Sequence, residues 1–381
     1  MPRHIIRVAA TLLAVWLACL LALAHSRYYI AYSFAAAAIV WLRTRPPRRR
    51  YLYVAAITGV LWAIRIAFGE QAAGPADPLP EQIFYVTAGF VGAGSLIMFA
   101  MFGLSDDRSA DPIELGAAFA ISTFGLVADR WFRYMTDHPL LSLDRTLFAV
   151  DDRLGFQASF AAGRAFVDWP PLGWLSAAAY RMLPLTIAFV FVSLPRRSAQ
   201  IKFSAAIASA AAIGYLAYRA CPAAGPAYAF PSMFPAAAPA IAAGWVHPVE
   251  MNSSLLNAFP SLHATWALLV LWWSRMLRPG ARAAVAAVVA LTLLATLGLG
   301  EHYLIDLAVA APFAVLFETV CSMQLSRWRR QAAAGALCAI AFLWWVVAVR
   351  SGRVLALDPV AVRALAAATI SLPLGLRLVS R

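Results

Sequence analysis

Long apolar runs limit what this chain can fold into more than any other feature of its sequence. A membrane-spanning helix needs roughly 20 mainly apolar residues, and hydrophobic residues make up 62% of the 381. Runs of nearly this length follow one another along the whole chain. The sequence therefore predicts an all-α, polytopic membrane bundle of about 12 transmembrane helices. The predicted spans are roughly 5–24, 28–42, 51–68, 83–104, 113–128, 172–194, 203–218, 264–277, 283–299, 307–323, 332–349 and 360–376.

The charges of the intervening loops predict how the bundle is oriented. Cytoplasmic loops of membrane proteins are enriched in Lys and Arg, whereas the loop at 69–82 has neither. With the amino terminus inside, that loop and the long segments 129–171 and 219–263 face outside. The arginine-rich loops then lie in the cytoplasm at 43–50, 195–202, 274–282 and 324–330. An amino-terminal run resembling a signal peptide is followed by the apolar segment 28–42, which favours an uncleaved helical hairpin.

The remaining composition argues against several other classes of protein. The net charge of +13 comes almost wholly from arginine, since Lys202 is the single lysine. These arginines sit mainly in short loops between apolar runs, whereas a nucleic-acid-binding protein would gather them on a polar domain. The four cysteines show no CxxC spacing, so neither a disulfide framework nor a metal site is predicted. We expect no nucleic-acid partner.

Two outer segments have distinctive patterns. The segment 219–257 is apolar but broken by prolines, which suits a re-entrant or lid segment. The segment 129–171 contains an amphipathic helix, which either lies in the lipid headgroup layer or packs over the bundle. Its apolar positions are Leu143, Leu147, Val150 and Leu154, and the charged positions opposite them are Asp144, Arg145, Asp151 and Arg153.

Two short polar segments, 259–263 and 301–306, carry the candidate chemistry. His263 and His302 are 39 positions apart, which allows one helix across the membrane, a short turn and one helix back. Both imidazoles therefore return to the same face. Asp306 follows His302 by four residues on one helix face, so its carboxylate can fix one ring nitrogen and leave the other as a nucleophile. Alternatively, this polar pair merely caps the next span.

The segment around His263 adds features that suit a phosphate. Pro260 and Ser261 are typical of a helix start, where unpaired N–H groups and the helix dipole attract anions. The Ser261 hydroxyl can donate a further hydrogen bond. Together with His302 and Asp306 on the same face, these residues predict a phosphate-handling site with covalent catalysis through histidine. No metal and no cofactor are expected.

These segments resemble a known family. Pro260-Ser261-x-His263 followed by His302-x3-Asp306 resembles the second and third motifs of the type-2 phosphatidic acid phosphatase superfamily of membrane lipid phosphatases. The longer strings Phe-Pro-Ser-Leu-His-Ala and Gly-Glu-His-Tyr-Leu-Ile-Asp are similar to its inositolphosphotransferase branch, typified by inositol phosphorylceramide synthases. The resemblance implies that His302 attacks phosphorus to form a phosphohistidine, that Asp306 orients it, and that His263 protonates the leaving oxygen.

The resemblance also implies a domain organisation. It covers roughly 113–325 and implies a six-helix catalytic core there, with accessory transmembrane helices at 1–112 and 326–381.

The chain departs from the superfamily in its phosphate-binding residues. The Ser-Arg pair expected six to seven residues before the nucleophile is replaced by Ala295 and Thr296. Arg219 is the best remaining guanidinium for gripping phosphate, or else an arginine that snorkels to the interface at the end of its span. Arg164 and Arg181 are further arginines that the sequence cannot place. The predicted phosphate-binding set is Ser261, Arg219, Glu301 and Tyr303.

The sequence thus predicts a lipid phosphotransferase or phosphatase in a bacterial inner membrane, acting at the periplasmic face. The substrate would be a phospholipid, sphingolipid or polyprenyl phosphate. Abundant arginine with almost no lysine hints at a GC-rich bacterium. Two other classes stay open. One is a transporter or flippase that uses the same polar residues as a proton relay, and the other is a catalytically inactive membrane scaffold.

Overall fold

The structure is a computed structural model, and it describes residues 32–44, 47–67, 79–102, 142–235, 256–324 and 326–379, together with 116–118, 121 and 124. These residues are mostly helical and include no strand, which confirms the all-α fold class. The chain divides into two compact units, Met1–Tyr134 with Phe191–Ser193, and Met135–Val190 with Leu194–Arg381. Each unit is described by itself.

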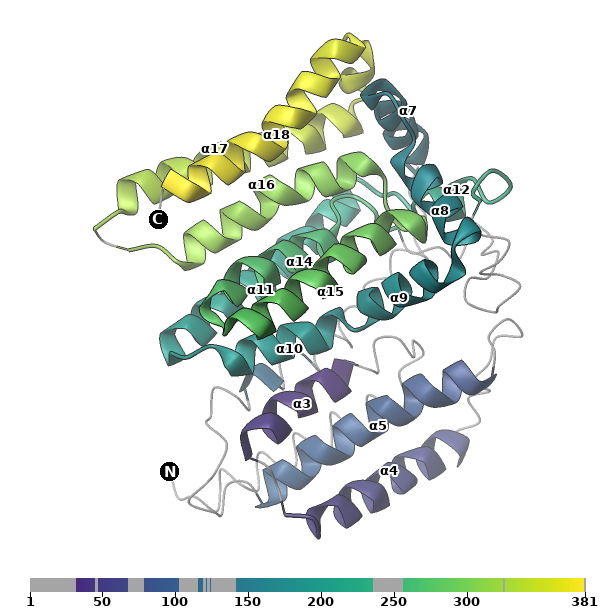
Figure 1. Cartoon of the computed structure of the whole chain (residues 1–381), viewed down its shortest axis with the longest axis vertical. Helices are drawn as coiled ribbons and strands as arrows, with labels where there is room; N and C mark the ends of the chain where they lie inside the picture. The colour runs from purple at the N-terminus through teal and green to yellow at the C-terminus, as the bar shows by residue number, and fades with distance from the viewer. Residues whose placement is uncertain are drawn as a thin grey trace. The chain divides into compact units, whose positions relative to one another are not determined.

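The first unit contains α3 (Tyr32–Thr44), α4 (Arg50–Ala67) and α5 (Leu79–Phe102), drawn in purple and blue in Figure 1. Small residues set the crossing of α3 and α5. A Cβ atom at Gly92 would lie 2.3 Å from the Phe34 nitrogen, so only glycine fits there. The Ser33 hydroxyl donates a hydrogen bond to the Gly89 carbonyl across the same crossing. Such close backbone approach is typical of helices that pack within a membrane.

The second unit contains the remaining helices, apart from Phe191–Ser193 at the end of α10, which belong to the first unit (Figure 1). They are α7 (Asp144–Leu154), α8 (Ala158–Asp168), α9 (Pro170–Arg181), α10 (Leu183–Ser193), α11 (Arg197–Ala220), α12 (Pro226–Ala229), α14 (Leu262–Trp273), α15 (Pro279–Gly298), α16 (Leu304–Cys321), α17 (Trp328–Arg350) and α18 (Pro359–Val379), with the 3-10 turns η2 (Ser274–Met276) and η3 (Arg353–Ala356).

Within the described residues, six helices are long and apolar enough to cross a membrane, namely α4, α11, α15, α16, α17 and α18. A seventh span results if α9 and α10, bent by 55° at Met182, count as one. On α17, large apolar side chains stay exposed at helical spacing, as lipid-facing positions would, at Leu337, Ile340, Leu343 and Val347. These helices indicate a membrane protein. The predicted count of about 12 spans is not confirmed. Span 5–24 and most of span 113–128 lie outside the described residues. At the predicted spans 28–42 and 264–277, the helices α3 and α14 have only 13 and 12 residues.

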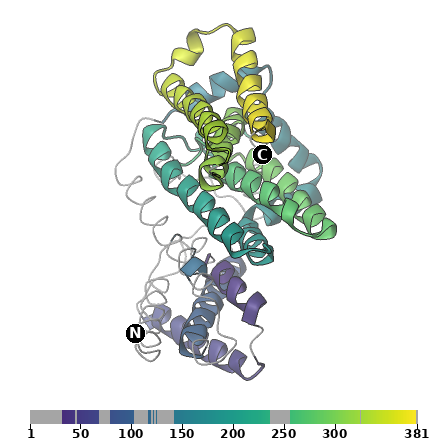
Figure 2. The same cartoon turned by 90° about the vertical axis from the view of Figure 1, so that its left-hand side faces the viewer.

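Helix α16 lies at the centre of the second unit. It packs against α11, α14, α17 and α18, and most of its residues are buried. In the view turned by 90°, the yellow-green and yellow helices of the C-terminal part still lie beside the rest of this bundle (Figure 2). The C-terminal helices therefore share one compact unit with the predicted core. Their separate accessory role, and the boundaries at 112 and 325, stay predictions.

The structure of α7 differs from the predicted amphipathic helix with one apolar and one charged face in segment 129–171. Asp144 and Asp151 are as deeply buried as Leu147 and Val150, with exposed fractions of 3% and 0% for the two carboxylates. A helix in the headgroup layer would keep its charged positions in water. Here both carboxylates are buried because backbone N–H groups of neighbouring loops satisfy them. Of the two alternatives, the structure supports a helix packed over the bundle.

Candidate active site

The first part of the site is the start of α14. Ser261 is the N-cap, and its Oγ accepts a hydrogen bond from the Ala264 N–H at 3.2 Å, which confirms the predicted cap. His263 follows in the first turn and is partly exposed. The N–H groups of Leu262 and His263 make no hydrogen bond within the part of the chain that the structure describes. This helix end therefore keeps two donors available for an anion.

The second part is the start of α16, where carboxylates occupy the free N–H groups. Asp306 Oδ2 accepts from the Tyr303 N–H at 2.7 Å. Asp151, on α7, accepts from the Leu304 N–H at 2.7 Å and from the Ile305 N–H at 3.0 Å. Negative groups stabilise a helix N-terminus both by hydrogen bonding and by acting on its dipole. The loop that carries His302 is thus attached to α7 and α16 together.

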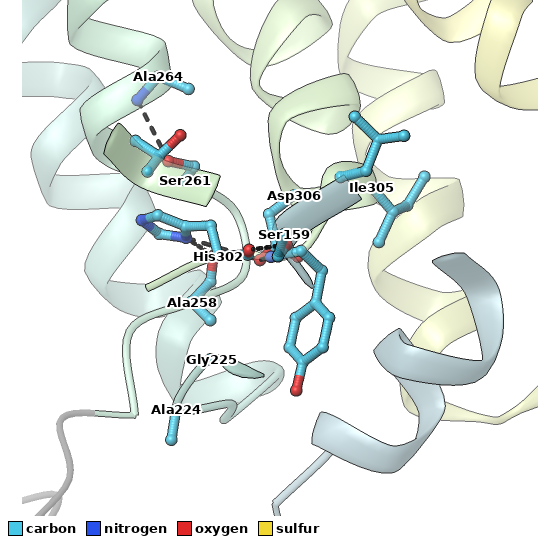
Figure 3. Close-up of polar contacts among 12 residues, drawn as sticks. Ser159, Ala224, Gly225, Ala258, Ser261, Ala264, His302, Ile305 and Asp306 are labelled. Carbon is cyan, nitrogen blue, oxygen red and sulfur yellow. Dashed lines mark hydrogen bonds and ion pairs between the residues drawn. The ribbon is translucent and has the colours of Figure 1, made fainter. Parts of the chain in front are cut away.

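The His302 imidazole is held by a backbone carbonyl. Its Nδ1 lies 2.7 Å from the Ala258 oxygen (Figure 3), and the residue is 2% exposed. A carbonyl can only accept, so Nδ1 carries the hydrogen and Nε2 keeps a free lone pair. The same segment is fixed from both sides, because Ala258 N–H donates to the Ala223 carbonyl at 2.8 Å and Ser159 Oγ donates to the His302 carbonyl at 2.7 Å.

Asp306 does not form the hydrogen bond to His302 that its spacing suggests. Its Oδ2 lies 3.6 Å from His302 Nδ1, beyond hydrogen-bond distance, because the Ala258 carbonyl already takes that nitrogen. Asp306 is fully buried, and its Oδ1 has no hydrogen-bond partner in the described part of the chain.

The two imidazoles face each other. The ring centroids of His263 and His302 are 6.4 Å apart. At this separation both rings are within reach of one phosphate group, whose atoms would have to lie about 3–3.5 Å from the ring nitrogens that act on them. His263 also stacks on Tyr180, with centroids 3.9 Å apart and planes 17° from parallel. Sequence reasoning missed Tyr180, because nothing near it in the chain signals this contact.

Asp144 is a further residue that sequence reasoning did not place at the site. It accepts hydrogen bonds from the N–H groups of Ala224 and Gly225, each at 2.9 Å, and from the Tyr303 hydroxyl at 2.8 Å. Tyr303 is fully buried, and its hydroxyl is thereby committed to Asp144. A role for Tyr303 in phosphate binding stays a prediction. Asp144 therefore connects α7 with the loops on either side of the histidines.

Two glycines let these loops cross. Gly225 and Gly300 have φ values of 99° and 72°, which favour glycine. A Cβ atom at Gly225 would lie 2.5 Å from the Glu301 carbonyl oxygen, and the Ala227 N–H donates to the Gly300 carbonyl at 3.0 Å. The segment Gly225–Tyr228 thus lies directly on the loop that carries His302. Larger side chains at either glycine would separate them.

Burial controls the protonation of His302 and Glu301. Burial lowers the pKa of His302 to about 4, opposed by the charge of Glu301 and by the hydrogen bond to Ala258. The ring is therefore neutral at pH 7, as a nucleophile must be. Burial raises the pKa of Glu301, while the Tyr228 hydroxyl, His302 and Arg181 act in the opposite direction. The Tyr228 hydroxyl donates to Glu301 Oε1 at 2.8 Å.

The three candidate arginines differ in their surroundings. Arg181, at the end of α9, is close enough to Glu301 for their charges to interact. Arg164 is exposed and pairs with Asp168 at 3.3 Å on its own helix. Arg219 lies in the last turn of α11, is partly exposed, and makes no ion pair within the described residues. Among those residues, no group of three His, Cys, Asp or Glu side chains is arranged to hold a metal.

A buried neutral histidine facing a second histidine, between helix starts of an apolar bundle, defines a membrane protein with a candidate phosphate site. Residues 145–320 match the family model described as the PAP2 superfamily. The matched segment runs from α7 to α16 and includes both histidines, Ser261 and Asp306. The match supports the PAP2 superfamily, whose members are phosphatases and phosphotransferases. It does not distinguish the inositolphosphotransferase branch. No match was found to a curated protein or to a solved structure.

Proposed function

We propose that this protein is an integral-membrane lipid phosphotransferase or phosphatase that works through a phosphohistidine on His302. The observation that carries this proposal is the pair of facing imidazoles, 6.4 Å apart, in which the Ala258 carbonyl fixes Nδ1 of His302 and leaves Nε2 free. A neutral, oriented imidazole is a competent nucleophile towards phosphorus. The match to the PAP2 superfamily supports phosphatase or phosphotransferase activity.

The first half-reaction forms the phosphoenzyme. The Nε2 lone pair of His302 attacks phosphorus, the P–N bond forms, and the bond from phosphorus to the leaving oxygen breaks. His263 donates its proton to that oxygen. The charge that develops on the His302 ring is stabilised by Asp306, whose Oδ2 lies 3.6 Å from Nδ1. The Leu262 and His263 N–H groups at the start of α14 are proposed to bind the phosphate oxygens, with the Ser261 hydroxyl.

The second half-reaction releases the phosphoryl group. Water or an alcohol attacks phosphorus, its proton passes to His263, and the P–N bond breaks to regenerate neutral His302. Water gives hydrolysis and an alcohol gives transfer. The resemblance to the inositolphosphotransferase branch favours an alcohol, while pocket shape decides which acceptor enters.

The proposed substrate is a phosphoester lipid of the outer leaflet, such as a phospholipid, sphingolipid or polyprenyl phosphate. The arginine-rich loops predict that the histidines face the periplasm, and a lipid would enter laterally between apolar helices. Arg181 and Arg219 are the proposed phosphate-gripping arginines. Arg181 is favoured because its charge already acts on Glu301, beside His302.

The test compares two histidine variants of the purified protein, given a small lipid panel. We expect His302→Ala to abolish turnover and to form no acid-labile phosphohistidine. His263→Ala should accumulate the phosphoenzyme when the substrate has a good leaving group, because bond cleavage then needs little proton donation while resolution still needs a base. Full turnover by His302→Ala would refute this mechanism and leave the transporter hypothesis ahead.

A further inference from the structure

A second polar site lies at the other end of α16. A cavity of about 250 Å³ opens there, and every residue that lines it is polar or charged. Glu318, which lines it, follows Asp306 by 12 residues along α16, about 18 Å at the helical rise. The lining includes three arginines, Arg275, Arg327 and Arg377. This cavity is therefore separate from the histidines and plays no part in the proposed chemistry.

The inner wall of the cavity is a fixed ion pair. Arg377 Nε lies 2.5 Å from Glu318 Oε2, and Nη2 donates to Oε1 at 3.2 Å. The guanidinium carbon of Arg377 lies 4.3 Å from the ring centroid of Trp272. A bidentate pair that also stacks on an aromatic ring is held in one geometry. Glu318 is thus already neutralised by Arg377.

Two arginines remain in excess at the rim. Arg275 Nη1 lies 3.5 Å from Glu318 Oε1, longer than a strong charge-assisted hydrogen bond, and its side chain is 39% exposed. Arg327 is exposed. Three arginines against one glutamate give the cavity lining a net charge of +2. Such a lining attracts a hydrated anion and disfavours an acyl chain.

The start of α17 adds positive potential to the same rim. Arg327 is its N-cap, and the Arg327 side chain makes no capping hydrogen bond. Gln331, in that turn, accepts a hydrogen bond from the Gln324 N–H at 2.7 Å. Both residues line the cavity, so the positive end of the helix dipole borders it.

We propose that this cavity binds the phosphate of an anionic phospholipid headgroup in the leaflet on the arginine-rich side of the bundle. A basic pocket between transmembrane helices is the arrangement that holds anionic lipid headgroups. A phosphodiester would contact Arg275 and Arg327, while Arg377 and Glu318 form the floor. The predicted topology makes this leaflet cytoplasmic, opposite to the proposed reaction. Free inorganic phosphate offers the same chemistry, so the experiment separates the two sources.

The test measures thermal unfolding and lipid retention of the full chain in zwitterionic lipid, with phosphatidylglycerol or inorganic phosphate added. The test variant is Arg275→Gln with Arg327→Gln. The matched control is Arg329→Gln with Arg330→Gln, which removes the same charge from neighbouring exposed positions that do not line the cavity. We expect phosphatidylglycerol to stabilise the wild type and the control, and to bind the test variant about 30-fold more weakly.

Three outcomes would overturn this proposal. They are equal binding of phosphatidylglycerol by test variant and control, no stabilisation of the wild type, or stabilisation by inorganic phosphate alone. Lipid retained by each folded variant, measured by native mass spectrometry, separates lost binding from lost folding. The same comparison in the His302→Ala background should give the same result. The proposed lipid-binding site can therefore be tested independently of the proposed reaction.

Discussion

The two helix starts at the candidate site are built in opposite ways. At the start of α16, the N–H groups of Tyr303, Leu304 and Ile305 all donate to carboxylates of Asp306 and Asp151. At the start of α14, Ser261 caps the Ala264 N–H, and within the described residues the two N–H groups before it have no hydrogen-bond partner. The two starts meet where the Ser261 N–H approaches the Asp306 carbonyl at 3.5 Å.

This difference separates two tasks. Carboxylates at the start of α16 hold the loop of His302 and occupy these three N–H donors. The start of α14 keeps its donors and carries the partly exposed His263. A helix N-terminus can either be satisfied internally, which gives rigidity, or left open, which gives an anion site. We infer that the start of α16 fixes His302 and that the start of α14 receives the phosphate.

Among substitutions at these two helix starts, we expect Asp306→Asn to lower turnover the most. The amide oxygen can still accept from the Tyr303 N–H, so the cap and the fold should persist. The amide 3.6 Å from His302 Nδ1 cannot carry a negative charge when the ring becomes an imidazolium, so turnover should fall by about 10²–10⁴-fold. The measurement is turnover with the unfolding temperature as a control. Turnover within a few-fold of wild type would mean that the Ala258 carbonyl alone suffices.

Asp151→Asn tests whether α7 positions the loop of His302. An amide has only one accepting oxygen, so one of the Leu304 and Ile305 N–H groups loses its partner. We expect a loss of about 1–3 kcal/mol in the free energy of unfolding and a fall in kcat of about 10–100-fold at unchanged KM. The neighbouring Asp152→Asn makes the same substitution at an exposed position. An equal effect of both variants on kcat would exclude a positioning role.

Ser261→Asp tests whether the start of α14 receives the phosphate. Aspartate caps a helix as well as serine does, so stability should be kept, but its charge repels an anion at the same N–H groups. KM should rise by about tenfold, the cost of roughly 1.4 kcal/mol of lost binding. In the same assay, Arg181→Ala should raise KM more than Arg219→Ala. If Ser261→Asp leaves KM unchanged, the phosphate binds elsewhere.

The smallest expected effect concerns the pH at which phosphoenzyme formation is lost on the acid side. Because burial lowers the pKa of His302 from 6.5 to about 4, the ring stays neutral well below pH 6.5. Phosphoenzyme formation in the His263→Ala variant should therefore fall only as the pH drops through about 4. Keeping the ring neutral also contributes to the free energy of unfolding. This contribution is fully present above pH 6.5 and is lost as the pH falls from 6.5 through about 4. A midpoint near 6.5 would show that His302 is solvated when it reacts.

The sequence by itself determined the fold class and the candidate chemistry. Apolar runs long enough to span a bilayer predict helices, because a backbone in lipid must satisfy its own hydrogen bonds. The spacing between His263 and His302 predicted that both lie at the same end of the α14–α15 hairpin. Ser261 was correctly predicted as a cap. These inferences use local periodicity and chain length, which a sequence records directly.

Only the tertiary structure decided how the site is held. The partner of His302 Nδ1 is the Ala258 carbonyl, and a backbone carbonyl carries no residue-type signal. Tyr180 reaches His263 from a helix more than 80 positions earlier. Asp144 and Asp151 looked like a solvated face, because periodicity tells which residues share a face but not what that face contacts. Burying a carboxylate is favourable only where donors from distant segments converge on it, and that convergence exists only in the folded chain.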